Sequence, residues 1–430
     1  MRDVKPVKVV LLGAGTVGSQ VARVFLEQSA EFESRSGRPL ELVGIAVRDL
    51  EKERPGIDKA LLTNDPMGLV TRGDIDIVVE VIGGLEPARG LILAAVKHGA
   101  SVVTANKALL AEYGDVIFRA AEASGVDVYY EAAVAGAIPI IRPLRESLVG
   151  DEITAVTGIV NGTTNYILEQ MTSHGVAYGD VLLEAQKLGY AEADPTADVE
   201  GFDAAAKAAI LASLAFHSQV RLTDVSREGI TSVTDGDIAA AADMDCVVKL
   251  LARCELSESG TISIGVHPTM ISNKHPLAGI NGAQNAIFIE SRYAGELMFM
   301  GPGAGGAPTA SAVLGDVVTA ARNRVRGTFA PGGSAYLTRG ITPAQEERSR
   351  YFVSLLVDDE PGVLAQVAAV FAGRGVSLQA VRQGEDASGL ARLNVVTHVA
   401  RNGDVVQTIA DLEQLSRVHA GIKIMRVEGA

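Results

Sequence analysis

The segment VKVVLLGAGTVG, residues 7–18, decides the fold of the first part of this chain. Its first six residues have the apolar pattern of a strand that is buried on both faces. Glycines follow at Gly13, Gly15 and Gly18, and a helical pattern then runs to Leu26. Gly13 permits a tight turn, Gly15 lets the backbone approach a ligand, and Gly18 lets the helix pack closely. The segment therefore predicts a strand, a turn and a helix in direct succession.

A glycine pattern of this kind is weak evidence alone, but between a strand and a helix it has the context that a dinucleotide-binding site requires. The amino terminus of the helix would face the pyrophosphate, where its backbone N–H groups favour negative charge. The alternative is a turn with only a structural role. The residues expected to line a cofactor are those of the turn itself: Gly13, Ala14, Gly15, Thr16, Val17 and Gly18.

The second predicted strand, residues 40–47, ends at two charged residues, Arg48 and Asp49. Arg48 could pair with the 2′-phosphate of NADP, whereas Asp49 could accept a hydrogen bond from the ribose 2′-hydroxyl of NAD. A third possibility is that both are solvated loop charges. The sequence favours NADP and leaves NAD open.

Strand and helix patterns continue to alternate after this point, which predicts parallel strands in an α/β domain. The strand patterns are IDIVVEVIGG, residues 75–84, and SVVTA, residues 101–105, with a helical pattern over residues 87–98 between them. Lys107 directly follows the second of these strands, at the edge where open α/β sheets bind ligands. It could also be an ordinary lysine in the first turn of a helix.

The stretch LGYAEADPTADVEGFDAAAKAAILASL, residues 188–214, places charges where burial is expected. Its alanine-rich part predicts a helix, on which Asp203 and Lys207 lie one turn apart. An exposed ion pair would lie opposite the large apolar residues, but these two charges lie among them, where burial is costly and perturbed pKa values are expected. Those apolar residues are Ile210, Leu211 and Leu214. We interpret this helix as one wall of an active site, and a surface ion pair as the alternative.

Three further carboxylates, Glu192, Asp194 and Asp198, precede this helix in a loop that contains a proline. They could reach the same cavity, and a small amino-acid substrate would need such partners for its ammonium group.

Two other segments offer backbone groups. The turn NGTTNY, residues 161–166, suits a carboxylate or a nicotinamide but is also an ordinary helix cap, and the glycines of GPGAGGAP, residues 301–308, could approach a cofactor or another chain segment.

Composition excludes several other classes of protein. A length of 430 residues is enough for about three domains. A net charge of −14 and a pI near 5.1 argue against nucleic-acid or anionic-membrane partners. No apolar run reaches the roughly 18 residues of a membrane span, and MRDVKPVK leads into a strand rather than a signal peptide, so we expect a cytoplasmic protein. Cys246 and Cys254 lie in the helical-looking CVVKLLARC and are interpreted as core residues.

Taken in order, five motifs resemble those of homoserine dehydrogenases that carry a C-terminal ACT regulatory domain: GAGTVG, TANKALL, NGTTNYIL, GYAEADPTADVEGFDAAAKAAILA and GPGAGGAPTASAVLGD. The resemblance covers essentially the whole chain, and the fourth motif is the most specific. It implies reversible, NAD(P)-dependent oxidation of L-homoserine to L-aspartate 4-semialdehyde, a step toward threonine and methionine.

The resemblance also implies roles for individual residues. Lys207 would donate and accept the proton at the reacting oxygen, and Lys107 would be a second lysine beside substrate and cofactor. Gly303 would lie by the nicotinamide. Asp203, a further catalytic residue, would with Glu192 and Asp198 bind the substrate or position Lys207. The other residues expected to bind the substrate are Gly162, Thr163 and Tyr190. The family's sodium site would correspond to Glu131, through its side chain or backbone, and to the carbonyls of Val134, Gly136 and Ile138.

A lysine at the reacting oxygen is chemically reasonable, because hydride delivery to an aldehyde builds negative charge that an ammonium group can stabilise and then protonate. Burial would lower the pKa of Lys207, whereas Asp203 one turn earlier would raise it. The sequence does not decide which effect is larger.

The last part of the chain follows a polar segment, residues 326–349, that we interpret as a linker. Residues 350–430 show a βαββαβ order, which predicts a ferredoxin-like unit. Its D-x-P-G turn at Asp359–Gly362 resembles ACT domains, which bind amino acids between copies, so we expect threonine as an effector. A purely oligomerising domain is the alternative.

The expected fold class is α/β. It comprises a Rossmann domain, residues 1–140, completed by a segment near 305–330, then an α+β catalytic and dimerisation domain, residues 141–320, and finally the ACT-like domain. We expect the whole chain to form a homodimer or a homotetramer. Two rivals are an oxidoreductase for another amino-acid aldehyde or alcohol and a cofactor-binding sensor without catalysis. The poorly placed cysteines disfavour an acylating semialdehyde dehydrogenase.

Overall fold

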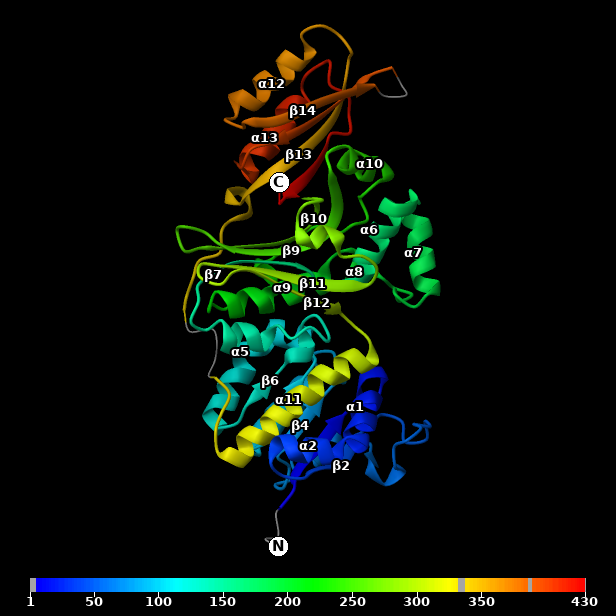
Figure 1. Cartoon of the computed structure of the whole chain (residues 1–430), viewed down its shortest axis with the longest axis vertical. Helices are drawn as coiled ribbons and strands as arrows, with labels where there is room; N and C mark the ends of the chain where they lie inside the picture. Colours follow the sequence, from blue (N-terminus) through cyan, green and yellow to red (C-terminus); the bar gives the residue numbers. More distant parts are fainter. Residues whose placement is uncertain (1–4, 332–336, 386–388, 430) are drawn as a thin grey trace. The chain divides into compact units, whose positions relative to one another are not determined.

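The computed structural model describes residues 5–331, 337–385 and 389–429 (Figure 1). The chain divides into two compact units. Unit 1 contains residues 1–156, 204–225 and 284–339, and unit 2 contains residues 157–203, 226–283 and 340–430. The first four residues of MRDVKPVK, and residues 332–336 of the predicted linker, lie outside the described residues.

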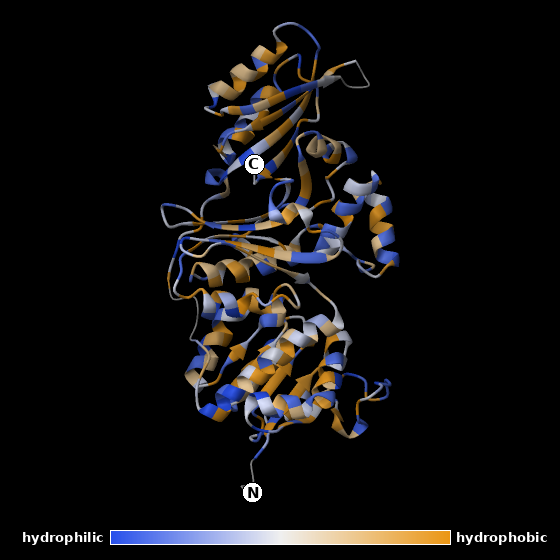
Figure 2. Cartoon of the chain, in the orientation of Figure 1, coloured by the Kyte–Doolittle hydropathy of each residue, from blue (hydrophilic) through white to orange (hydrophobic). Residues whose placement is uncertain are grey.

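Unit 1 is built on a six-stranded parallel sheet whose order is β3-β2-β1-β4-β5-β6. This is the doubly wound order of dinucleotide-binding domains, so the predicted Rossmann fold is confirmed. Figure 2 shows the strands of this sheet coloured as hydrophobic, as expected for strands covered on both faces. The strands are β1 (Val7–Leu12), β2 (Leu40–Ala46), β3 (Leu62–Thr63), β4 (Ile77–Glu80), β5 (Ser101–Thr104) and β6 (Val128–Tyr129).

Helix α11 returns to this sheet from far along the chain and packs beside α1, as the yellow and blue helices of Figure 1 show. Its residues Val313, Leu314 and Val317 share one core with Val9 and Leu11 of β1. The helices of unit 1 are α1 (Thr16–Glu27), α2 (Ser29–Ser36), α3 (Pro66–Val70), α4 (Ala88–Lys97), α5 (Lys107–Ser124) and α11 (Gly306–Arg326). Short helical turns are η1 (Lys59–Leu61), η2 (Glu131–Ala133), η3 (Pro143–Ser147) and η4 (Leu222–Asp224). Unit 1 also contains the antiparallel hairpin of β11 (Gln284–Ser291) and β12 (Gly295–Pro302).

The turn between β1 and α1 needs its glycines for steric reasons. Gly13 has a φ of 100°, a left-handed conformation that favours glycine. A Cβ on Gly18 would lie 2.0 Å from the carbonyl oxygen of Gly13, so a larger residue cannot be accommodated without a shift of the helix. The predicted strand, turn and helix are therefore present, and the helix packs directly against the turn.

The long hairpin of unit 2, formed by β9 (Cys246–Leu256) and β10 (Ile262–Ser272), corrects one sequence interpretation. The segment CVVKLLARC is not helical. It belongs to strand β9, which pairs with β10 along the whole length of β9, Cys246 and Cys254 included. Both cysteines are buried, as predicted. The other elements of unit 2 before its C-terminal part are β8 (Ser226–Arg227), α6 (Gly162–His174), α7 (Tyr178–Lys187), α8 (Thr196–Val199), α10 (Asp235–Asp243) and η5 (Pro276–Gly279). Strand β7 (Ile153–Ile159) and helix α9 (Phe202–Ala215) span positions where the chain passes between the units.

The C-terminal part of unit 2 has the predicted βαββαβ order, with one short additional strand, β16. Its sheet runs β17-β13-β15-β14, and all three pairings are antiparallel. Strand β17 also pairs in parallel with β10, where Thr269 is opposite Arg426 and Ile271 is opposite Glu428. The ferredoxin-like module is thus joined edge to edge to the hairpin of unit 2. Its elements are η6 (Ala344–Glu346), β13 (Arg348–Val357), α12 (Val363–Gly373), β14 (Leu378–Glu385), β15 (Ala391–Thr397), β16 (Ala400–Arg401), α13 (Asn402–Leu412) and β17 (Lys423–Glu428).

Within the described part of the chain, none of the helices has both the length and the apolar character that a membrane crossing needs.

A buried lysine, Lys249 of β9, ties α6 to a loop of unit 2. Its Nζ donates to Asn165 Oδ1 at 3.0 Å and to the carbonyl of Ile280 at 2.6 Å, and the residue is 2 % exposed. Asn165 in turn donates to the carbonyls of Ile280 and Gly282. Burial lowers the pKa of Lys249 to about 8, although Glu169 acts in the opposite direction.

This pKa predicts how the stability of the protein depends on pH. Between pH 8 and the ordinary lysine pKa near 10.5, the unfolded chain binds the proton more tightly than the folded one, so the free energy of unfolding rises with pH. Over that window wild type should gain roughly 3 kcal/mol relative to Lys249→Met, which lacks the group. The measurement is the thermal midpoint of both proteins from pH 7 to 10.5. A constant difference would contradict the prediction.

Candidate functional site

The glycine-rich loop after β12 lies directly against the predicted cofactor turn of unit 1. A Cβ on Gly306 would lie 3.0 Å from the carbonyl oxygen of Thr16. Gly306 is the first residue of α11, and Thr16 is the first residue of α1. The amino termini of the two helices therefore meet at the predicted turn, Gly13–Gly18, and offer backbone N–H groups to an anion there.

Gly303 lies between two other residues of unit 1. A Cβ on Gly136 would be 2.5 Å from the Gly303 carbonyl oxygen, and a Cβ on Gly303 would be 2.0 Å from Asn285 Nδ2. The amide of Ala137 donates to the Pro302 carbonyl at 3.2 Å. The structure thus brings together the residue expected at the nicotinamide, Gly303, and part of the segment expected at the cation.

Asn285 is a residue that the sequence reasoning missed. It is 1 % exposed on β11, and neither Nδ2 nor Oδ1 has a hydrogen-bond partner among the residues that the structure describes. A buried amide without partners is costly, so an unpaired one calls for an explanation. The only signal in the sequence is an asparagine within the apolar strand QNAIFIES.

The carboxylate of Glu131 is engaged by backbone. It accepts the amides of Ile140, Ile141 and Arg142 at 2.6, 2.7 and 3.1 Å. The amide of Glu131 donates to Asp316, which also pairs with Arg142. Burial raises the pKa of Asp316 to about 6, against the opposing effect of Arg142. Among the residues described here, no three His, Cys, Asp or Glu side chains are grouped to hold a metal. Any cation site on this segment would therefore rest on backbone carbonyls, those of Glu131, Val134, Gly136 and Ile138.

The two charges after β2 differ in their surroundings. Asp49 accepts the amides of Glu51 and Lys52 at 2.9 and 3.3 Å, so it caps its own loop. Arg48 is exposed at the carboxyl end of the strand. This difference favours Arg48 over Asp49 as the group that would meet the cofactor's ribose.

Lys107 is the first residue of α5 and is half-buried. The helix cap before it, Asn106, accepts the amide of Leu109 and donates to the carbonyl of Gly84. Buried Glu80, also missed from sequence, accepts Thr104 Oγ1 at 2.5 Å and the amides that follow β4. These bonds fix the carboxyl ends of strands β4 and β5, next to which helix α5 begins at Lys107.

In unit 2, the turn before α6 gathers the predicted carboxylates. Asn161 Nδ2 donates to Asp198 at 2.7 Å and to Asp203 at 2.9 Å. Thr163 Oγ1 donates to the Tyr190 carbonyl at 2.6 Å and lies 3.2 Å from Asp198. Asn161 also caps α6, so the cap and the site are the same turn. Asn161 and Thr163 thereby group three other residues expected at the site, Asp198, Asp203 and Tyr190.

The remaining candidates of unit 2 have different surroundings. Gly162 packs on the loop after η5, because an added Cβ would lie 2.6 Å from the Ala283 carbonyl oxygen. Glu192 is exposed, and its carbonyl accepts Gln186. Asp194 accepts the amide of Thr196 at the start of α8, and its hydrogen bonds with Thr196 lower its pKa. Asp194 therefore binds the backbone at the start of α8.

Lys207 of α9 is buried, with 8 % exposed. The sequence predicts one apolar face for this helix. In the structure every residue from Ala204 to Ala212 is buried, so the helix is buried on all its faces. Asp203, partly exposed, lies one turn before it. The helix therefore holds an ionisable group in an apolar setting, one turn from a carboxylate that binds Asn161.

Three family models match the chain in succession. These are "Homoserine dehydrogenase, NAD binding domain" over residues 13–131, "Homoserine dehydrogenase" over residues 139–318, and "ACT domain" over residues 351–417.

Several similar proteins match almost the full length of the chain. A homoserine dehydrogenase of Corynebacterium glutamicum is 53 % identical over 98 % of this chain and 96 % of its own, and one of Mycobacterium tuberculosis is 52 % identical over 99 % of both. The crystal structure of a homoserine dehydrogenase from Thiobacillus denitrificans superposes with a TM-score of 0.94 at 40 % identity, covering 99 % of this chain and 98 % of the other. A hyperthermophilic archaeal homoserine dehydrogenase in complex with NADPH gives 0.63 at 30 %, covering 74 % and 98 %.

Proposed function

Because this chain belongs to the homoserine dehydrogenase family, we propose that it interconverts L-homoserine and L-aspartate 4-semialdehyde on the route to threonine and methionine. The observation that carries the proposal is the group formed by Asn161, Asp198 and Asp203, of which Asp203 lies one turn before buried Lys207 on the same helix. Carboxylates held in this way suit the ammonium group of an amino-acid substrate.

Lys207 acts at the reacting oxygen. In the direction of reduction, negative charge grows on the aldehyde oxygen, and the Lys207 ammonium stabilises that charge and then supplies the proton. In the direction of oxidation, the neutral amine accepts the hydroxyl proton. The nicotinamide cofactor supplies or takes the hydride. Asp198 and Asp203 orient the substrate, and Lys107 at the edge of the sheet provides a second positive charge.

The cofactor is NADP in this proposal, with NAD as the alternative. The Gly13–Gly18 turn fits the pyrophosphate, Gly303 packs against the Asn285 amide with no space for a side chain, and Arg48 offers a guanidinium to a 2′-phosphate. For the sodium site of the family, we assign backbone carbonyls, because the Glu131 carboxylate is already held by three amides.

Threonine is proposed as the feedback effector, acting through the ACT domain. We also propose a homodimer or homotetramer in the cytoplasm. We propose the domains 1–140, completed by a segment near 305–330, then 141–320, the linker 326–349 and 350–430; the matches of the family models to residues 13–131, 139–318 and 351–417 support this division. Removing residues after Arg348 would uncover β10, so point variants are the better test of regulation.

The activity itself is tested by following NADPH and NADH formation by absorbance with L-homoserine. We expect turnover with both or with NADP alone. Absence of turnover with L-homoserine, in a protein that still binds NADPH, would contradict the proposal and favour another substrate or a sensor.

Asn285→Leu tests whether the unpaired amide serves the cofactor. We propose that this amide binds the nicotinamide carboxamide beside Gly303, so the variant should raise the dissociation constant of NADPH about tenfold or more. The thermal midpoint of the cofactor-free protein should stay equal or rise, because a buried amide without partners costs about 1–3 kcal/mol. A fluorescence titration and a melting curve measure the two. A lower midpoint with unchanged affinity would show a purely structural residue.

A further inference from the structure

The first turn of α6 is held in place by the buried ammonium group of Lys249. This group donates to Asn165 Oδ1 at 3.0 Å and to the carbonyl of Ile280 at 2.6 Å. Asn165 Nδ2 donates to the same carbonyl at 3.1 Å and to the carbonyl of Gly282 at 2.9 Å. One lysine and one asparagine therefore fasten the first turn of α6 to residues 280–283.

A lysine is a costly residue at this position. Burial removes its ammonium group from water, and the first turn of a helix disfavours positive charge. Leu251, the next residue on the same face of β9, is apolar and buried. An aliphatic side chain would therefore suit the packing at Lys249 better. What the lysine adds is its two hydrogen bonds, which an aliphatic side chain cannot make.

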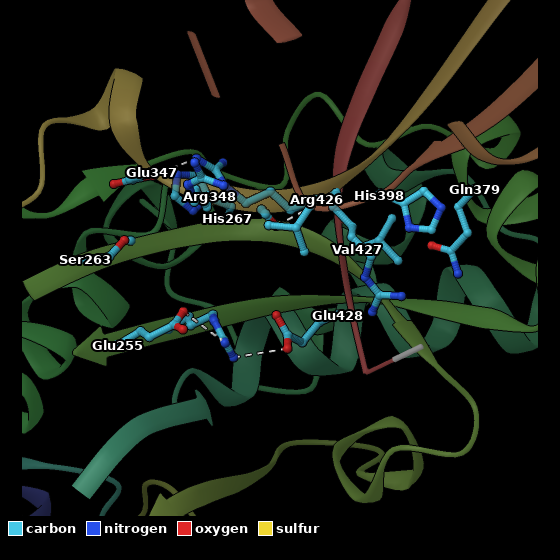
Figure 3. Close-up of a pocket in the computed structure, with 15 residues that line it drawn as sticks. Glu255, Ser263, His267, Glu347, Arg348, Gln379, His398, Arg426, Val427 and Glu428 are labelled. Carbon is cyan, nitrogen blue, oxygen red and sulfur yellow. Dashed lines mark hydrogen bonds and ion pairs between the residues drawn. The ribbon is translucent and has the colours of Figure 1, made fainter. Parts of the chain in front are cut away.

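Strand β9 is fixed further along by a second cation, Arg253. It pairs with Glu255 at 3.0 Å and with Glu428 of β17 at 3.1 Å, at the charged cavity where Figure 3 shows both glutamates. Its guanidinium also donates to Thr157 of β7 at 3.2 Å. These partners lie on strands, so Lys249 acts from a strand whose place in the sheet is set by bonds other than those to α6.

The same turn of α6 holds the two carboxylates of the proposed substrate site. Asn161 Nδ2 donates to Asp198 at 2.7 Å and to Asp203 at 2.9 Å. Asn161 Oδ1 accepts the amide of Thr164 at 2.9 Å and its hydroxyl at 3.0 Å. The carboxamide of Asn161 is thus bonded to the turn on one side and to both carboxylates on the other, so its position follows that of the turn.

The segment between the two carboxylates is held by other residues. The guanidinium of Arg227 donates to the Glu200 carbonyl. The amide of Ile230 donates to the Val199 carbonyl at 2.8 Å, and Thr231 Oγ1 donates to the Glu200 carboxylate at 3.0 Å. Because this segment is fixed independently of α6, a shift of the α6 turn would strain its bonds to the carboxylates rather than carry the carboxylates with it.

We propose that Lys249 is a positioning residue for substrate binding. By fastening the first turn of α6 to residues 280–283, it keeps Asn161 bonded to Asp198 and Asp203 and so sets the spacing of the two carboxylates that receive the substrate ammonium group. Lys249 acts through Asn165 and this turn and does not itself bind the substrate. The inference rests on the proposed function, because it concerns the same carboxylate site.

Lys249→Met tests the proposal, because methionine has a similar shape but donates no hydrogen bond. The KM for L-homoserine should rise about tenfold, kcat should fall by less than about threefold, and the dissociation constant of NADPH should change by less than about twofold. The KM for L-aspartate 4-semialdehyde should rise by the same factor, because both substrates carry the ammonium group. Initial rates in both directions and a fluorescence titration measure these quantities. An unchanged KM in the folded variant would overturn the proposal.

Asn165→Ala removes the partner of Lys249 on α6 and keeps the lysine. It should raise the KM for L-homoserine by a similar factor, and it decides the question if Lys249→Met does not fold. Because both residues act through the same bonds, the double variant should raise KM by less than about twofold beyond either single variant. A rise of about 100-fold, the product of two independent effects, would show that the residues act separately and would overturn the proposal.

The matched control is Arg253→Met, which removes a half-buried cation from the same strand, where its partners named above lie on β7, β9 and β17. It should lower the thermal midpoint and leave KM within about twofold of wild type. An equal rise of KM in Arg253→Met would assign the effect to lost stability and overturn the proposal. Normal wild-type turnover with an unchanged KM in Lys249→Met and Asn165→Ala would refute this inference alone, whereas a wild type that binds NADPH without oxidising L-homoserine would refute the proposed function.

Discussion

Lys207→Met is expected to lower kcat for L-homoserine oxidation by about 10²–10⁴-fold, the usual contribution of a positioned proton-transfer group. The residue is 8 % exposed on α9, a helix that is buried along almost its whole length, so bulk water cannot readily take over its proton transfer. Methionine has a similar shape and keeps the packing. Initial rates with NADP measure the effect. The dissociation constant of NADPH should change by less than about threefold, because other residues than Lys207 are proposed to line the cofactor.

Two further variants make the result specific. Lys207→Arg keeps a positive charge but holds its proton at all working pH values, so it should restore part of the charge stabilisation and none of the proton transfer. Lys187→Met, at an exposed position on α7, should behave as wild type. If Lys207→Met kept a kcat within about threefold of wild type, the general acid and base role would have to move to another group, and Lys107 would be examined first.

The features of this site that could be predicted from sequence are those that depend on residues close together in the chain. Asp203 and Lys207 are four positions apart, so helical periodicity alone puts them on one side of α9. The turn Gly13–Gly18 follows from the order of strand, glycines and helix. The dual role of Asn161, as helix cap and as partner of two carboxylates, was not predicted, because it requires the loop that carries Asp198 to return to the same turn.

Features that depend on strand register could not be predicted. Asn285 is opposite Gly301 in the β11–β12 hairpin, and this pairing is what brings the loop of Gly303 over its amide. A shift of one residue would turn Asn285 to the other face of the strand. The same limit explains the error at Cys246 and Cys254, since a short apolar run fits a helix and a strand equally well until its partner, β10, is known.

The proposed sodium site shows a different limit. The sequence leaves open whether Glu131 contributes its side chain or its backbone. In the fold, its carboxylate accepts three amides, and its own amide is held by Asp316. A carboxylate has a limited number of acceptor sites, so these bonds remove most of its capacity for a cation. Competition for hydrogen bonds, which sequence does not show, therefore decides which atoms a segment can offer to a ligand.

Gly15→Ala and Gly18→Ala are expected to separate cofactor binding from folding at the turn that defines the first domain. At Gly18 an added methyl group lies 2.0 Å from the Gly13 carbonyl oxygen, so α1 must move away from the turn, and the free energy of unfolding should fall by roughly 3 kcal/mol. At Gly15 an added methyl group meets nothing within 4 Å, and the backbone angle φ of −82° is normal for alanine. Stability should therefore change by less than about 0.5 kcal/mol.

The open space at Gly15 is where the backbone would approach the pyrophosphate. Its methyl group should therefore raise the dissociation constant of NADPH about 100-fold, equivalent to about 2.7 kcal/mol, in a protein whose thermal midpoint is unchanged. Melting curves and NADPH fluorescence titrations of both variants test this contrast. If Gly15→Ala bound NADPH as wild type does, the pyrophosphate would not lie over Gly15, and the turn would have only the packing role that Gly18 shows.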